Sequence, residues 1–106
     1  MSHDARLTII GKHKGVDYES ITVTNASAIG FTSSKISTAP RPKRAFCTSE
    51  TGSMRYRYDG TDPETTEGHL LLPTDTLIVE GIQNMENFKV IATSATSGKI
   101  KVTYEF

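Results

Sequence analysis

The chain has 106 residues, which is enough for one hydrophobic core and too short for two. Its 12 lysines and arginines balance 12 aspartates and glutamates, so no overall field steers the protein toward nucleic acid or an anionic membrane. No apolar run approaches the roughly 20 residues of a membrane-spanning helix, and no charged-then-apolar leader follows Met1. We therefore expect residues 1–106 to form one soluble domain without an export signal.

Short clusters of β-branched residues fill the first third of the chain, and no window has the apolar spacing of an amphipathic helix. We predict a strand over ARLTIIG (5–11), a turn or loop over HKGVDYES (13–20), and strands over SITVTN (20–25) and IGFTSSKIS (29–37). Residues 1–14 have polar ends around LTII, which makes them a candidate N-terminal arm that adds a strand to a neighbouring molecule.

Two prolines, Pro40 and Pro42, predict a connection or a sheet edge, because proline cannot donate to a β-ladder. Two strands should follow, over KRAFCTSE (43–50) and SMRYRYD (53–59), joined around Thr51-Gly52, where glycine permits a positive φ.

The single cysteine, Cys47, excludes an intrachain disulfide framework and a cysteine-rich zinc site. It should share one strand face with Ala45 and Ser49. Because no histidine lies near it in sequence, we expect a small buried apolar side chain rather than a nucleophile.

The stretch MRYRYDGTDPETTEGHLLL (54–72) alternates arginine with tyrosine and then becomes acidic. Asp59 and Gly60 predict a tight turn, and Pro63 fixes φ in the loop that follows. The carboxylates of this loop lack the ligand spacing of an EF-hand, so a solvated loop is favoured over a Ca²⁺ site.

Three more elements follow, beginning with a strand over DTLIVEGI (75–82) that ends at Gly81 and leads into a polar connection, QNMEN (83–87). The runs FKVIATSA (88–95) and GKIKVTYEF (98–106) predict a β-hairpin whose turn contains Gly98 at positive φ. Altogether we predict an all-β domain of about seven or eight short strands, either a β-sandwich or a jelly-roll-like barrel.

The sequence has little that indicates catalysis. The three histidines, His3, His13 and His69, have no second ligand at a metal-binding spacing, and no nucleophile elbow or phosphate loop is present. Tryptophan is absent and aromatic residues are 8% of the chain, which argues against a glycosidase cleft. We expect no enzymatic activity, no metal and no cofactor.

Basic residues occur in two groups that are candidates for contact with a partner. Arg55 and Arg57 should lie on one strand face, where they either pair with acids of a neighbouring strand or anchor an interface. Arg41, Lys43 and Arg44 lie beside the prolines and form either a solvated connection or a contact to an acidic patch on a protein. Without a basic stripe, nucleic acid is not an expected partner.

One set of motifs in the second half of the chain resembles small virion structural proteins of tailed bacteriophages. The motifs are the Arg-aromatic strand at Arg55 and Arg57, the turn at 59–63, a Gly-x-Leu-Leu step at Gly68, and the terminal VTYE at 102–105. This sequence departs from the pattern after Pro63, where it has Glu64 and Thr65.

The resemblance implies a non-catalytic β-sandwich that decorates, cements or connects a phage capsid. Its implied partners are the major capsid protein or neighbouring virion proteins and further copies of itself, as a dimer or trimer. Its implied location is the virion, assembled in the host cytoplasm. A second resemblance, carried by Tyr56 and the turn Asp59-Gly60-Thr61-Asp62-Pro63, is to Ig-like carbohydrate-binding or accessory modules of carbohydrate-active enzymes, and this is the alternative.

Overall fold

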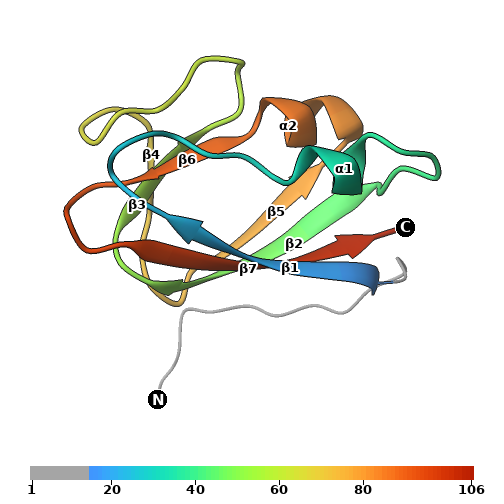
Figure 1. The fold of residues 1–106 in the computed structure, drawn as a ribbon, viewed down its shortest axis with the longest axis horizontal. Helices are drawn as coiled ribbons and strands as arrows, with labels where there is room; N and C mark the ends of the chain where they lie inside the picture. The colour runs from blue at the N-terminus through green and yellow to red at the C-terminus, as the bar shows by residue number, and fades with distance from the viewer. Residues whose placement is uncertain (1–14) are drawn as a thin grey trace.

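The computed structural model describes residues 15–106, which form two packed antiparallel β-sheets (Figure 1). The strands are β1 (Gly15–Val23), β2 (Arg44–Thr51), β3 (Met54–Arg57), β4 (His69–Leu71), β5 (Thr76–Glu80), β6 (Lys89–Ala92) and β7 (Gly98–Glu105). Two short helices, α1 (Ser33–Ile36) and α2 (Ile82–Asn87), lie together at one end of the domain (Figure 1). The prediction of an all-β sandwich is confirmed. The predicted N-terminal arm and the strand over 5–11 lie outside the described residues.

Sheet A has four strands in the order β1-β7-β2-β5, and sheet B has three in the order β4-β3-β6. The predicted hairpin of the last two strands is wrong, because β6 pairs with β3 in sheet B while β7 pairs with β1 and β2 in sheet A. The connection between β6 and β7 therefore passes from one sheet to the other. Both segments are strands as predicted, and it is their partners that differ.

The core lies between the two sheets, and β7 contributes three of its most buried side chains. Ile100, Val102 and Tyr104 are fully buried, as the alternation in GKIKVTYEF predicted. Complete burial of side chains of this size contributes roughly 1.5–3 kcal/mol each. Phe31, in the connection between β1 and α1, stacks on Phe88 with 4.7 Å between the ring centroids. It also meets the Tyr104 ring edge-on at 5.7 Å.

The strands β2 and β3 occupy the predicted segments, and the connection between them also passes from sheet A to sheet B. Gly52 in this connection has a φ of 74°, the positive value that the sequence predicted. Ala45, Cys47 and Ser49 share the inner face of β2 and are all buried, as expected.

Two predictions in the first third of the chain are wrong. The supposed turn or loop over 13–20 belongs, from Gly15 onward, to the nine-residue strand β1, which also includes most of SITVTN. The supposed strand over 29–37 contains only an isolated bridge, from Ile29 to Val90, and then helix α1. Polar residues occupy some inward positions of β1, so its sequence lacks the alternation of apolar and polar residues that indicates a strand.

Two elements lie where the sequence suggested loops. The polar connection QNMEN belongs to helix α2, which begins after Gly81 and buries Met85. The three-residue strand β4 pairs with β3 and buries only Leu71. Both are too short for a periodic pattern to distinguish them from a turn.

Gly98 is not the positive-φ turn residue that we predicted. It is the first residue of β7 and is buried against the side chain of Met54. A Cβ at this position would lie 2.8 Å from Met54 Cγ, which is closer than carbon atoms approach in proteins. The glycine is needed here for close packing between the sheets.

Candidate interaction sites

A groove follows the free edge of β5, on the side of the sandwich where β4 and β5 end the two sheets. We define this edge groove by two adjoining hollows of about 290 and 340 Å³ that share Tyr58 and Asn84. The first hollow is lined by four consecutive residues of β5, Leu77 to Glu80. Consecutive strand residues point to opposite faces, so the groove lies along the strand's edge.

Aromatic rings from sheet B form the wall opposite β5. The His69 ring lies 5.3 Å from the Tyr56 ring and 6.3 Å from the Tyr58 ring. Tyr56 is half-buried, and this burial is the main reason why the pKa of its hydroxyl is raised. Tyr58 is about half exposed and so presents a ring to solvent.

Arg57, one of the predicted partner residues, lies at the rim of the edge groove. Its guanidinium binds the Asp59 carboxylate through two hydrogen bonds, of 3.1 and 2.5 Å. That pairing, together with a hydrogen bond from the backbone N–H of Thr61, lowers the pKa of Asp59 to about 2. The pKa of Arg57 is raised mainly by the same hydrogen bonding, and the charges of Glu67 and Glu64 raise it further.

The predicted turn residues Asp59, Gly60 and Pro63 form a connected corner. Asp59 accepts a 3.2 Å hydrogen bond from Thr61, two residues ahead, and Gly60 has a φ of 89°. Pro63 is buried, although its neighbours are exposed. Its Cβ packs near Gly68, where an added Cβ would lie 3.3 Å from it.

Arg55, the other arginine of β3, contacts the loop that follows the strand. Its Nη1 donates a 2.9 Å hydrogen bond to the backbone oxygen of Gly68, which ties β3 to the end of the acidic loop. The side chain is half-buried and its Nε has no hydrogen-bond partner within residues 15–106. Arg55 therefore braces the loop, while Arg57 remains at the surface of the groove.

The second basic group is divided between solvent and the sheet. Arg41 and Lys43 are exposed. Arg44 lies on the outer face of sheet A, where its Nε pairs with the buried Glu105 and its Nη1 lies 3.8 Å from Glu80. Arg44 therefore forms ion pairs within the domain, whereas Arg41 and Lys43 remain exposed.

The outer face of sheet A has a row of three large apolar or aromatic residues and one threonine that sequence analysis missed. Residues directly opposite one another across all four strands are Tyr18, Thr103, Phe46 and Ile78, which we call the outer strip. Tyr18 is 55% exposed and Ile78 is 38% exposed. The register places these residues in one line, and no local pattern in the sequence contains that register.

Polar residues flank the outer strip on both sides. One flank is the ion-paired set of Arg44, Glu80 and Glu105. The other contains Lys101, whose Nζ lies 3.7 Å from Glu50 and 3.2 Å from Ser20 Oγ. An apolar centre within a polar rim is the usual anatomy of a protein–protein interface.

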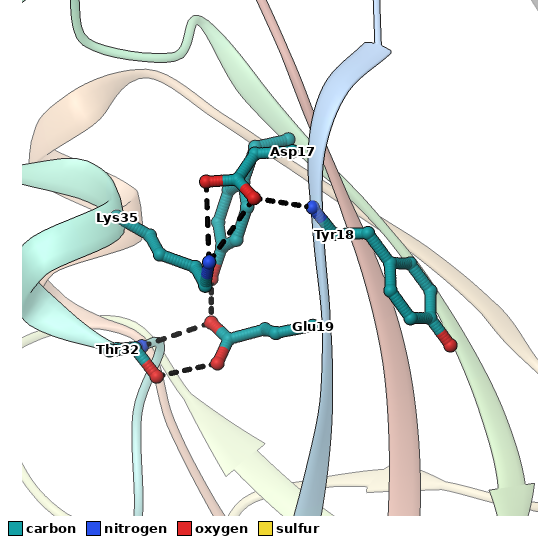
Figure 2. Close-up of polar contacts among 6 residues, drawn as sticks. Asp17, Tyr18, Glu19, Thr32 and Lys35 are labelled. Carbon is teal, nitrogen blue, oxygen red and sulfur yellow. Dashed lines mark hydrogen bonds and ion pairs between the residues drawn. The ribbon is translucent and has the colours of Figure 1, made fainter.

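A polar cluster lies under α1, on the opposite side of β1 from Tyr18 (Figure 2). The Glu19 carboxylate accepts hydrogen bonds from Thr32 N at 3.1 Å, from Thr32 Oγ1 at 2.5 Å, and from the hydroxyl of Tyr104. Lys35 Nζ contacts both carboxylate oxygens of Asp17, at 3.1 and 3.3 Å. Burial first, and then the bond to Glu19, raises the pKa of Tyr104. Each group is paired, so the cluster holds the 24–37 segment on the sheet.

Other candidate chemistry has little support in residues 15–106. Cys47 is buried, and this burial is the main reason why the pKa of its thiol is raised, which disfavours a reactive thiolate. In this part of the chain, no group of three metal-ligating side chains is close enough to hold an ion. Neither described helix is long and apolar enough to cross a membrane. His69 serves in the aromatic wall.

No protein-family model, curated protein or solved structure matches this chain.

Proposed function

We propose that the protein is a non-enzymatic structural protein of a tailed-phage virion, which oligomerises and binds the capsid through the outer face of sheet A. The outer strip is the observation that carries this proposal. The resemblance of the RYRYDGTDP, Gly-x-Leu-Leu and VTYE motifs to virion proteins supports the choice of partner.

The composition of the outer strip suits a binding surface of this kind. Tyr18 and Phe46 are of the aromatic type that interfaces favour, and the charges beside them are already paired within the domain. Docking would therefore bury apolar area without leaving an unpaired charge. A domain of this size offers little area to one partner, but an oligomer on a repeating lattice multiplies weak contacts.

The test combines solution mass with capsid binding. Light scattering of the purified protein should give a discrete oligomer, and the protein should pellet with phage capsids that lack it. Tyr18→Asp should weaken this pelleting by about tenfold or more, since it places a charge in the apolar strip. Circular dichroism would verify that the variant is folded.

The matched control is Ala95→Asp, which adds the same charge at an exposed position in the connection between β6 and β7. It should pellet like the unaltered protein. A monomer that ignores capsids, with or without the substitution, would contradict the proposal. Binding to glycans by that monomer would favour the carbohydrate-module alternative, for which the exposed Tyr58 ring is the supporting observation.

A further inference from the structure

We propose that the edge groove binds the N-terminal arm, residues 1–14, of a second copy of this chain as an added β-strand. The inference rests on the proposed function only in that it assumes an oligomer. It assigns the contact between copies to a surface distinct from Tyr18 and Phe46, which face the capsid in our proposal.

The groove has the two features that strand addition requires. The first is an edge without a strand partner, since β5 pairs only with β2 in the described part of the chain and only its last residue, Glu80, has its backbone oxygen bonded by a side chain, at 2.9 Å from Asn84 Nδ2. The second is a set of hollows beside that edge for alternate side chains of the incoming strand. Leu77, Val79 and Phe88 supply the apolar lining, and Tyr58 forms the opposite wall.

Exposed apolar side chains are concentrated in the β3–β5 part of the chain, and two of them, Tyr58 and Ile78, line the groove. Among the described residues, six large hydrophobic side chains are exposed, and four of them belong to the β3–β5 region: Tyr58, Leu70, Leu72 and Ile78. An uncovered sheet edge with apolar neighbours is an aggregation hazard that proteins usually cover. A strand from another copy would cover it.

The arm has a sequence that suits the groove. Residues 5–11, ARLTIIG, place Leu7 and Ile9 on one face of an extended segment. Fourteen extended residues reach roughly 46–50 Å. The described domain measures 37 × 36 × 20 Å, so the arm is long enough to reach a neighbour.

The geometry of sheet A favours an arm from another copy. The arm joins β1 at Gly15, and β1 and β5 are opposite edges of the sheet. To reach its own β5, an arm would have to cross a whole sheet face. In adjacent copies, the β1 edge of one molecule can face the β5 edge of the next.

Charge complementarity supports the same occupant. The rim of the groove has Glu80, whose side chain is 67% exposed, and Glu64 and Glu67 act on Arg57 at its other end. The arm contains Arg6, Lys12 and Lys14 and a single acid, Asp4. A basic strand would therefore meet acids at both ends of a groove whose neighbouring arginines, Arg44 and Arg57, are already ion-paired.

Crosslinking between full-length variants tests this inference. Protein carrying Leu7→Cys or Ile9→Cys is mixed with differently tagged protein carrying Asn84→Cys, and a short bismaleimide is added. Asn84 is exposed and lines both hollows, while Cys47 is buried and should not react. At least one arm variant should give a mixed covalent dimer with about tenfold or higher yield than the control pair.

The control replaces Asn84→Cys with Thr22→Cys, an exposed position on β1 at the opposite edge of sheet A. Equal yields from the two pairs would overturn the inference, as would a double variant in one chain that crosslinks only to itself. Capsid pelleting is measured on the same samples. Pelleting without the mixed crosslink would refute the arm contact alone, whereas a mixed crosslink without pelleting would refute the capsid role alone.

Discussion

The hydroxyl of Tyr104 is the buried end of the hydrogen-bonded cluster around Glu19, and it can be removed with little change in shape. Tyr104→Phe should lower the free energy of unfolding by about 1.5–3 kcal/mol, because a buried bond to a charged acceptor is lost. Urea unfolding measures the change. Tyr18→Phe is the matched control, since that tyrosine is exposed, and it should alter stability by less than about 0.5 kcal/mol.

Gly60 has space around it but an unusual backbone. An added Cβ would meet only Asn87 Oδ1, at 4.0 Å, whereas the φ of 89° is one that β-branched residues rarely adopt. Gly60→Val should therefore destabilise the fold by about 1–2 kcal/mol. Gly60→Asn should cost less, because asparagine tolerates positive φ. Equal losses in thermal unfolding would argue against backbone strain as the cause.

The ion pair between Arg57 and Asp59 at the rim of the groove leads to two predictions, one for the oligomeric state and one for the pKa of Asp59. Arg57→Ala should leave the domain folded and alter its oligomeric mass by light scattering. In the same variant the pKa of Asp59 should rise from about 2 toward the ordinary value near 3.8, as measured by NMR titration. Because the folded-state pKa is depressed, the pair stabilises the fold above pH 3.8 and this contribution fades as pH falls toward 2. An unfolded variant would make Arg57 a structural brace.

At the scale of elements, the contact between Gly98 and Met54 joins the beginning of β7 to the beginning of β3. Gly98→Ala should destabilise the domain by about 1–3 kcal/mol, because the new methyl group displaces the fully buried Met54 side chain. Combining it with Met54→Val should recover part of the loss, as the smaller side chain makes room. Strictly additive losses in chemical denaturation would show that the two positions do not compete for space.

Strands with clean alternation could be predicted from sequence, and those with polar inward positions could not. The residues of β7 alternate between buried and partly exposed, so its segment and buried face were predicted correctly. In β1 the inward residues include Asp17 and Glu19, whose partners Lys35 and Thr32 come from a segment more than ten residues away. Only the tertiary structure makes those polar positions compatible with an inner face.

Strand pairing was the weakest part of the prediction, for a physical reason. A short connection suits a hairpin equally well as a passage between two sheets, and the connections from β2 to β3, at Gly52, and from β6 to β7, just before Gly98, both change sheets. The edge groove and the outer strip depend on that pairing. Sequence analysis therefore identified Arg57 as a candidate but missed Tyr18, Phe46 and Ile78, which only the strand register aligns. It also missed Asn84, which reaches the groove from α2.

At the scale of the whole molecule, the proposed capsid contact and the proposed contact between copies use two different surfaces. The outer strip crosses the face of sheet A, and the edge groove follows its β5 margin, with Ile78 common to both. Because β1 and β5 are opposite edges of sheet A, a lattice contact at the Tyr18 end of the outer strip leaves the groove free for a contact between copies. Substitutions at Tyr18 and at Asn84 separate them, because each of these residues belongs to one surface.

The strand order of sheet A also governs how the chain folds. β7 lies between β1 and β2, and its register joins Ile21 to Ile100 and Ser49 to Ile100. Neither β1 nor β2 pairs with a strand that is adjacent to it in sequence. Both can pair only after a segment many residues downstream has come into place. Closing such loops costs entropy before any contact compensates for it. We therefore expect slow folding, on the order of milliseconds to seconds, in which docking of β7 is the step that completes the sheet.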